Sequence, residues 1–242
     1  MPPTPAKPID SAYDPHGPLR FKVAPNIVED LGLNLYTSLP RVIAEFVANA
    51  YDADSPAADI TMDLEAISKA RDGLRAAYKR ERQEAAESAY PHGDDTPIGM
   101  RTLPPNITIV VEDSGCGMSR EDIGRKFLVA GRRRREVDEG DHTHTPRGRL
   151  IMGRKGLGKL AGFGVAKQVE VVSRKLGEQH ATRIVLSYDE LVKKHVTDDI
   201  EIGETTLEDG GGFATSGTRV ILSGLMHDPT KSRAETIRGE IA

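Results

Sequence analysis

The sequence is short of the features that mark secreted and membrane proteins. Its 242 residues contain one cysteine, Cys116, which excludes an internal disulfide framework and makes a reducing cytoplasm the expected location. No apolar run approaches the roughly 18 residues that a membrane span needs, and the first residues lack the charged-then-apolar pattern of a signal peptide. The formal net charge of -4 is too small to indicate nucleic-acid binding. We expect a cytoplasmic protein without membrane contact, long enough to bury a sizeable core.

A helix with one polar face is predicted over residues 45–53, and the preceding segment leads into it with Ser38 as the N-cap and Pro40 in the first turn. Glu45, Asn49 and Asp52 are spaced four and three residues apart, so they project from one side of that helix. Apolar residues such as Phe46 cover most of the remaining circumference, which indicates that the helix lies against a core. A carboxylate beside an amide on a half-buried helix is suited to positioning a water and a metal ion. The alternative interpretation is a polar face that meets only solvent.

A glycine-rich segment follows the predicted strand at residues 107–112. It begins at Asp113 and reads Asp-x-Gly-x-Gly-Met. Glycines this close together allow tight turns and close approach to a ligand. Asp113 is placed to accept a hydrogen bond from an exocyclic amine, although an aspartate before glycines also marks an ordinary turn. Ser119, with Asp122 three residues on, predicts a capping box at the start of a helix.

A second glycine-rich segment contains Gly153, Gly156 and Gly158 and precedes a predicted apolar helix at residues 160–166. Glycines before a helix offer free backbone N–H groups and a positive helix end to an anion. The spacing is not that of a Walker motif. No strand immediately precedes the segment, as a Rossmann unit requires.

We expect a mobile lid at residues 127–155, with cationic edges that include the arginine run at 132–135. A basic run also fits binding of phosphate or nucleic acid. It lacks the interleaved aromatic residues that stack on single strands. His142 and His144 have no partner at ligand spacing, so a zinc site is not expected.

The remaining segments are assigned from composition and periodicity. Residues 1–20 predict a flexible proline-rich arm, with a dimer-exchange arm as the alternative. Residues 65–105 predict a helical insertion with a narrow apolar stripe, interpreted as a surface elaboration or as a protein-binding arm. Residues 229–242 are expected to begin a C-terminal extension. Further strands are expected at 59–64, 168–173, 181–187, 200–205 and 216–222, and short helices at 26–31 and 188–195.

Four motifs stand in one order along the chain: Glu-x-x-x-Asn-Ala-x-Asp-Ala, Asp-x-Gly-x-Gly-Met, Gly-x-x-Gly-x-Gly and a late Gly-Thr. This order resembles the Bergerat-fold (GHKL) ATPases, the superfamily of DNA gyrase B, the ninety-kilodalton heat-shock chaperone, histidine kinases and MutL. Within it, the chain looks most like bacterial chaperone-like and MORC-like members. The resemblance implies one ATP-binding domain, residues 21–228. Its implied fold is α/β, a two-layer sandwich whose mixed, mainly antiparallel sheet is covered on one face by helices.

The resemblance also implies roles for individual residues. Glu45 would be the general base that activates the attacking water, and Asn49 would hold Mg²⁺. Asp113 would accept from the adenine amine of ATP, with Thr218 supporting that contact through water. The other positions implied to contact or surround the nucleotide are Asp52, Gly115, Gly117, Met118, Gly153, Lys155, Gly156, Leu157, Gly158 and Lys159.

These roles predict an ATPase whose lid closes on Mg-ATP and drives homodimerisation or clamping of a partner. Gyrase- and MutL-like members take a lysine for the γ-phosphate from a second domain. None is identifiable here, and Lys155 and Lys159 are local substitutes, so hydrolysis is expected to be slow. The alternative is a non-hydrolysing, nucleotide-gated module that binds protein or DNA. A histidine kinase is not expected, since only the short arm precedes the domain.

Overall fold

The computed structural model describes residues 14–23, 38–87, 96–130, 143–153, 158–193 and 200–226. Its largest feature is a six-stranded sheet in which every neighbouring pair of strands runs antiparallel. The strand order is β2 (Ala58–Met62), β3 (Ile109–Asp113), β9 (Gly217–Leu225), β5 (Ala166–Arg174), β6 (Ala181–Ser187) and β8 (Glu204–Leu207). The expected α/β fold with a mainly antiparallel sheet is confirmed.

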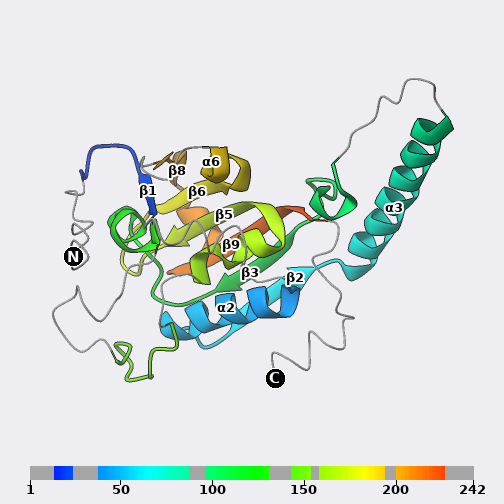
Figure 1. Ribbon diagram of the computed structural model, residues 1–242. Coiled ribbons are helices and arrows are strands. Elements are labelled where there is room, and N and C mark those ends of the chain that lie inside the picture. Colours follow the sequence, from blue (N-terminus) through cyan, green and yellow to red (C-terminus); the bar gives the residue numbers. More distant parts are fainter. Residues whose placement is uncertain are drawn as a thin grey trace, which may run out of the picture.

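The helix α2 (Leu39–Asp52) and the 3-10 helix η3 (Gly158–Gly164) pack together over this sheet (Figure 1). Pro40 lies in the first turn of α2, where its missing N–H removes no helical hydrogen bond. Phe46 is buried beneath the helix. A Cβ on Gly162 would lie 2.7 Å from Val169 of β5 and 3.5 Å from Phe46, so η3 is wedged between the sheet and α2.

A second, three-stranded sheet has β1 (Arg20–Val23) at its centre. The strand β1 runs parallel to β4 (Val129–Ala130) and antiparallel to β7 (Ile200–Glu201). Leu19 is only 1% exposed and Phe21 is fully buried, so the core begins within the last residues of the expected arm. Arg120 holds the chain just before β1 by donating a hydrogen bond to the Gly17 carbonyl at 2.6 Å.

The helix α3 (Leu64–Glu87) extends away from the sheet, as Figure 1 shows. Ile67 is its one buried residue, and Ala70 and Leu74 pack at the edge of the core. Near its far end, Glu81 forms an ion pair with Arg101 at 2.7 Å. The prediction of a charged helix with a narrow apolar stripe is confirmed. Among the described residues, no helix is both long and apolar enough to cross a membrane.

Most short elements lie where the sequence predicts them, with three differences. The strand predicted at 59–64 ends at Met62, and Leu64 already begins α3. The predicted helix at 160–166 is the 3-10 helix η3, and its last residue, Ala166, already belongs to β5. The predicted strand at 200–205 is split between β7 and β8, which belong to different sheets. The other described elements are η1 (Ile98–Met100), α4 (Arg120–Asp122), the π-helix η2 (Ile123–Phe127), α6 (Tyr188–Lys193) and η4 (Gly210–Gly212). The expected helix at 26–31, the arginine run at 132–135 and the extension at 229–242 lie outside the described residues.

Candidate functional site

The polar face of α2 meets the start of η3. Glu45 is half-buried and Asn49 is exposed on this face. A Cβ on Gly158 would lie 2.6 Å from Oε2 of Glu45 and 3.8 Å from Oδ1 of Asn49. Glycine therefore lets the backbone of the second glycine-rich segment approach the carboxylate and the amide of α2. The structure brings these three predicted site residues together.

Asp52 binds the chain that leads into the same glycine-rich segment. Its Oδ1 accepts the Met152 N–H at 2.8 Å, and its Oδ2 accepts the Gly153 N–H at 2.9 Å. In this structure the Gly153 N–H is therefore engaged by the end of α2. Asp52 ties the glycine-rich segment to the helix that carries Glu45 and Asn49.

Asp54 makes a second attachment, which the sequence reasoning missed. The residue is 8% exposed, and its φ of 60° places it in the left-handed region. The carboxylate accepts from the hydroxyl of Thr145 and from the backbone N–H of Arg147 at 3.1 Å. The guanidinium of Arg149 lies 3.8 Å from Oδ1 and donates to the Ser55 carbonyl at 2.8 Å. We call residues 143–153, held by Asp52 and Asp54, the docked loop.

The carboxyl end of β3 lies level with Thr218 of the adjacent strand β9 and with Ser173 of the next strand, β5. Thr218 of β9 is the register partner of Asp113 on one side and of Ser173 of β5 on the other. Oδ1 of Asp113 accepts the Gly115 N–H at 2.8 Å. Burial raises the pKa of Asp113, the Glu112 carboxylate adds to that rise, and the N–H groups of Gly115 and Thr218 act against it. The predicted pair of Asp113 and Thr218 is thus adjacent in the structure.

The two glycines after Asp113 are required by contacts within the chain. A Cβ on Gly115 would lie 2.6 Å from the Ala53 carbonyl oxygen. Gly117 has a φ of 62°, and its Cβ would lie 1.9 Å from the Arg174 carbonyl oxygen. Cys116 donates its N–H to the same Ala53 carbonyl at 2.9 Å. The loop therefore fits between the end of α2 and the end of β5, which fixes Asp113 relative to Asn49.

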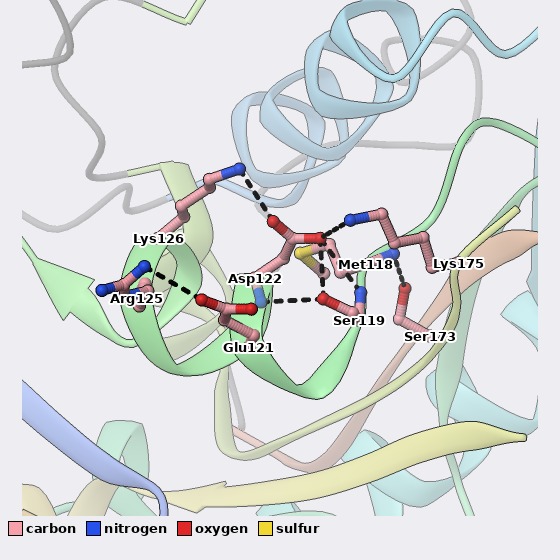
Figure 2. A network of polar contacts seen from close by, with 8 residues as sticks. All are labelled: Met118, Ser119, Glu121, Asp122, Arg125, Lys126, Ser173 and Lys175. Carbon is pink, nitrogen blue, oxygen red and sulfur yellow. Dashed lines mark hydrogen bonds and ion pairs between the residues drawn. The ribbon is translucent and has the colours of Figure 1, made fainter. Parts of the chain in front are cut away.

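A network of polar contacts holds the segment that follows (Figure 2). Met118 donates its N–H to the Ser173 hydroxyl at 2.9 Å. Ser119 and Asp122 form the predicted capping box, and Asp122 also accepts from Lys126 and Lys175, each at 2.7 Å. Burial would raise the pKa of Asp122, but the hydrogen bonds from Lys126, Lys175 and Ser119 outweigh it and hold that pKa well below its ordinary value. The network joins α4 to the end of β5.

Ser173 is a second residue that the sequence reasoning missed. It is fully buried on the same side of β5 as Val169 and Val171, as the alternation of the strand dictates. Strand periodicity alone could have identified it, because it places the serine on the buried face after two valines. A buried hydroxyl at such a position needs hydrogen-bond partners. Lys155, Gly156 and Leu157 lie outside the described residues, and the side chain of Lys159 is not described.

The donor chemistry of the site fits a magnesium nucleotide. Within the described part of the chain, no three or more His, Cys, Asp or Glu residues gather as a metal cluster. Mg²⁺ needs no such cluster, since it takes one or two protein oxygens and completes its shell with phosphate and water. The amide oxygen of Asn49 beside the Glu45 carboxylate is a donor set of that kind.

Comparison with known proteins agrees with this geometry. A putative type II restriction enzyme, HgiDII, of Herpetosiphon aurantiacus is 30% identical over 88% of this chain and 26% of its own length. The chaperone protein HtpG of Mesorhizobium japonicum is 36% identical over 49% of this chain and 19% of its own, and HtpG of Rickettsia rickettsii is 27% identical over 48% and 17%. The aligned part of the chain thus spans about a quarter or less of these relatives. Residues 36–218 match the family described as histidine kinase-, DNA gyrase B-, and HSP90-like ATPase, and the chain belongs to that family.

Proposed function

We propose that this chain is an ATP-binding domain that hydrolyses Mg-ATP slowly and couples lid closure to homodimerisation or to clamping of a partner. The observation that carries the proposal is the meeting of Glu45 and Asn49 with the backbone at Gly158. Membership of an ATPase family supports nucleotide binding in general. At the other end of the site, Asp113 and Thr218 are register partners on two adjacent interior strands, which supports placing the adenine amine beside them.

In this mechanism Glu45 orients a water and accepts its proton as the water attacks the γ-phosphorus, while the bond from that phosphorus to the β,γ-bridging oxygen breaks and ADP leaves. The Asn49 amide oxygen would hold Mg²⁺, which, when bound, neutralises charge on the phosphates. Asp52 holds the backbone at Met152 and Gly153 and so keeps the phosphate-facing segment against α2. Asp113 binds the base and orients the nucleotide along the helix.

The test is steady-state hydrolysis combined with measured nucleotide affinity. Glu45→Ala is expected to lower the turnover number about 100-fold or more, because general-base catalysis typically contributes that much. Its Kd for ADP should stay within about threefold of wild type. Glu84→Ala, which removes an exposed carboxylate from α3, is the matched control and should retain full turnover. Equal turnover in wild type and Glu45→Ala would refute the catalytic role.

A second candidate is a nucleotide-gated module that binds DNA or protein without hydrolysis. The similarity to a putative restriction enzyme over most of this chain favours a role next to DNA. This function predicts saturable ATP binding, no turnover above background, and ATP-dependent DNA affinity that falls steeply with salt. Turnover that Glu45→Ala abolishes while leaving binding intact would exclude it as the whole function.

A further inference from the structure

The helix α3 carries its positive charges unevenly around its circumference. Arg71, Arg75, Lys79 and Arg82 are spaced four, four and three residues apart, so they lie on one side of the helix, within an arc of about 80°. We call these four cations the basic stripe. The formal net charge of -4 conceals it, because that value averages over the whole chain. The carboxylates of α3 all lie outside the arc, at Glu65, Asp72, Glu81, Glu84 and Glu87.

Most of the basic stripe is accessible to a partner. Arg71 is half-buried, whereas Arg75, Lys79 and Arg82 are exposed. The helix itself extends away from the main sheet (Figure 1). Asp72 approaches Arg75 at 3.6 Å, but both side chains are more than half exposed, and surface pairs of this kind contribute little. A partner of high negative charge density can therefore displace Asp72 at little cost.

The far half of α3 is held in place by contacts on a neighbouring side of the helix. Arg101 forms its ion pair with Glu81 at 2.7 Å, and its guanidinium lies 4.8 Å from the centre of the Tyr78 ring. Arg101 also donates a hydrogen bond to the Thr96 carbonyl at 3.3 Å. These contacts fix the part of the helix that carries Lys79 and Arg82, so the basic stripe is presented on an ordered element.

The pattern of charge and apolar contact on α3 fits DNA better than a membrane. A helix that lies on a membrane needs an apolar face that it can bury in lipid. On α3, Ile67, Ala70 and Leu74 already pack against the core, and Tyr78 lies against Arg101. Duplex DNA presents one phosphate per about 3.4 Å of each strand. At 1.5 Å per residue the basic stripe spans about 16 Å, which is the length of about five phosphates of one strand.

We propose that the basic stripe of α3 binds the phosphate backbone of duplex DNA without reading its sequence. This binding goes beyond the proposed ATP hydrolysis and requires no nucleotide, and it would also supply the DNA contact that the second candidate function needs. Each neutralised phosphate releases counterions, so the logarithm of the binding constant falls by about 0.9 per contact for each tenfold rise in salt. Four cations therefore predict a slope of at most about 4.

Two double variants of α3 remove the same charge from different sides of the helix. Arg75→Gln/Lys79→Gln takes one arginine and one lysine from the basic stripe, and Lys69→Gln/Arg80→Gln takes one of each from outside it. All four side chains are exposed, and glutamine is a good helix former, so both variants should fold.

The measurement is fluorescence anisotropy of a labelled duplex of about 20 base pairs, without nucleotide, over roughly 50–200 mM KCl. Arg75→Gln/Lys79→Gln should weaken DNA binding about tenfold or more at the lowest salt and reduce the salt slope by about 2. Lys69→Gln/Arg80→Gln should bind DNA within about threefold of wild type and keep the wild-type slope.

Equal losses of affinity in the two double variants would overturn the inference, because the DNA would then respond only to net charge. Wild type that fails to bind the duplex at the lowest salt, or binds it without salt dependence, would overturn it as well. Displacement of the duplex by poly-glutamate or by anionic vesicles at equal charge would assign the basic stripe to an acidic protein or to a membrane instead. Because the assay contains no nucleotide, failure of ATP binding or hydrolysis leaves its outcome unchanged.

Discussion

At the scale of single residues, the buried carboxyl of Asp113 opposes folding at neutral pH. Because burial raises its pKa, its ionised form is less favourable in the folded protein than in the unfolded chain. The stability associated with this group is therefore fully present below its unfolded pKa of 3.8 and is lost as the pH rises through the higher folded value. At neutral pH the buried carboxylate costs stability, which the binding of a donor group would offset.

Asp113→Asn is accordingly expected to stabilise the ligand-free protein at pH 7.5, while weakening ADP binding about tenfold or more through loss of the charged acceptor. The stabilisation should shrink on lowering the pH to 4.5, because a carboxyl with a raised pKa takes up its proton at a higher pH in the folded protein than in the unfolded chain. Thermal unfolding at both pH values, with ADP titration, measures both effects. Asp59→Asn, on an exposed position of β2, is the control. A variant that is less stable than wild type at pH 7.5 contradicts the assigned sign.

At the scale of elements, the docked loop is attached at two separate points, one on the last residue of α2 and one on the turn that follows the helix. Asp54 engages the loop at Thr145 and Arg147, and Asp52 engages it at Met152 and Gly153. Since the expected lid includes these residues, opening of that segment would require these hydrogen bonds to break.

Amide hydrogen exchange should show that the two attachments of the docked loop break independently of each other. Asp54→Ala should speed exchange of the Arg147 amide and leave that of Gly153 near its wild-type rate, whereas Asp52→Ala should do the reverse. Asp54→Ala should also lower the free energy of unfolding by about 1–3 kcal/mol, because buried donors lose their acceptor. Residue-resolved amide exchange and urea unfolding give both values. Faster exchange of both amides in both variants would mean that the loop opens as one unit.

The sequence predicts elements well where the pattern is local. The strand β6 occupies the predicted residues, and the capping box of Ser119 and Asp122 forms as its spacing indicates. The prediction is wrong at 200–205 because strand periodicity does not identify partners: Ile202 donates its N–H to Leu19 between the two short strands. The role of Asp54 likewise depends on residues far along the chain, for which no local pattern exists.

In the candidate site, too, local motifs were predictable from the sequence and contacts between distant residues were not. The motifs that contain Glu45, Asn49 and Asp113 were found from spacing, and the structure places the first two beside Gly158 and the third beside Thr218. The contact between the hydroxyls of Thr218 and Ser173 could not be predicted, because it follows from the register of β9 with β5.

For the whole molecule, nucleotide binding should appear as a gain in global stability. Binding to the folded state alone adds about 2.7 kcal/mol when ligand exceeds Kd 100-fold, which for a chain of this size corresponds to a Tm rise of about 5–10 °C. The Tm should rise further with each increase in Mg-ATP concentration and rise less when EDTA removes the metal. Thermal unfolding across a Mg-ATP series measures this, with Asp113→Asn as the weak-binding comparison. A Tm that does not respond to Mg-ATP in wild type would contradict nucleotide binding.

The long connection through α3 affects how easily β2 and β3 of the main sheet can pair. Met62 and Ile109 are register partners, so the chain leaves the sheet and re-enters it at the same place. The segment between them, residues 63–108, is roughly 20 times longer than a two-residue hairpin loop. Closing it costs only about 3 kcal/mol more in chain entropy, since that penalty grows with the logarithm of loop length. Packing of Ile67 against the core acts against this penalty near the point of departure. The pairing of β2 with β3 thus tolerates wide variation in the length of what lies between them, and the far end of α3 is free to vary without disturbing the site.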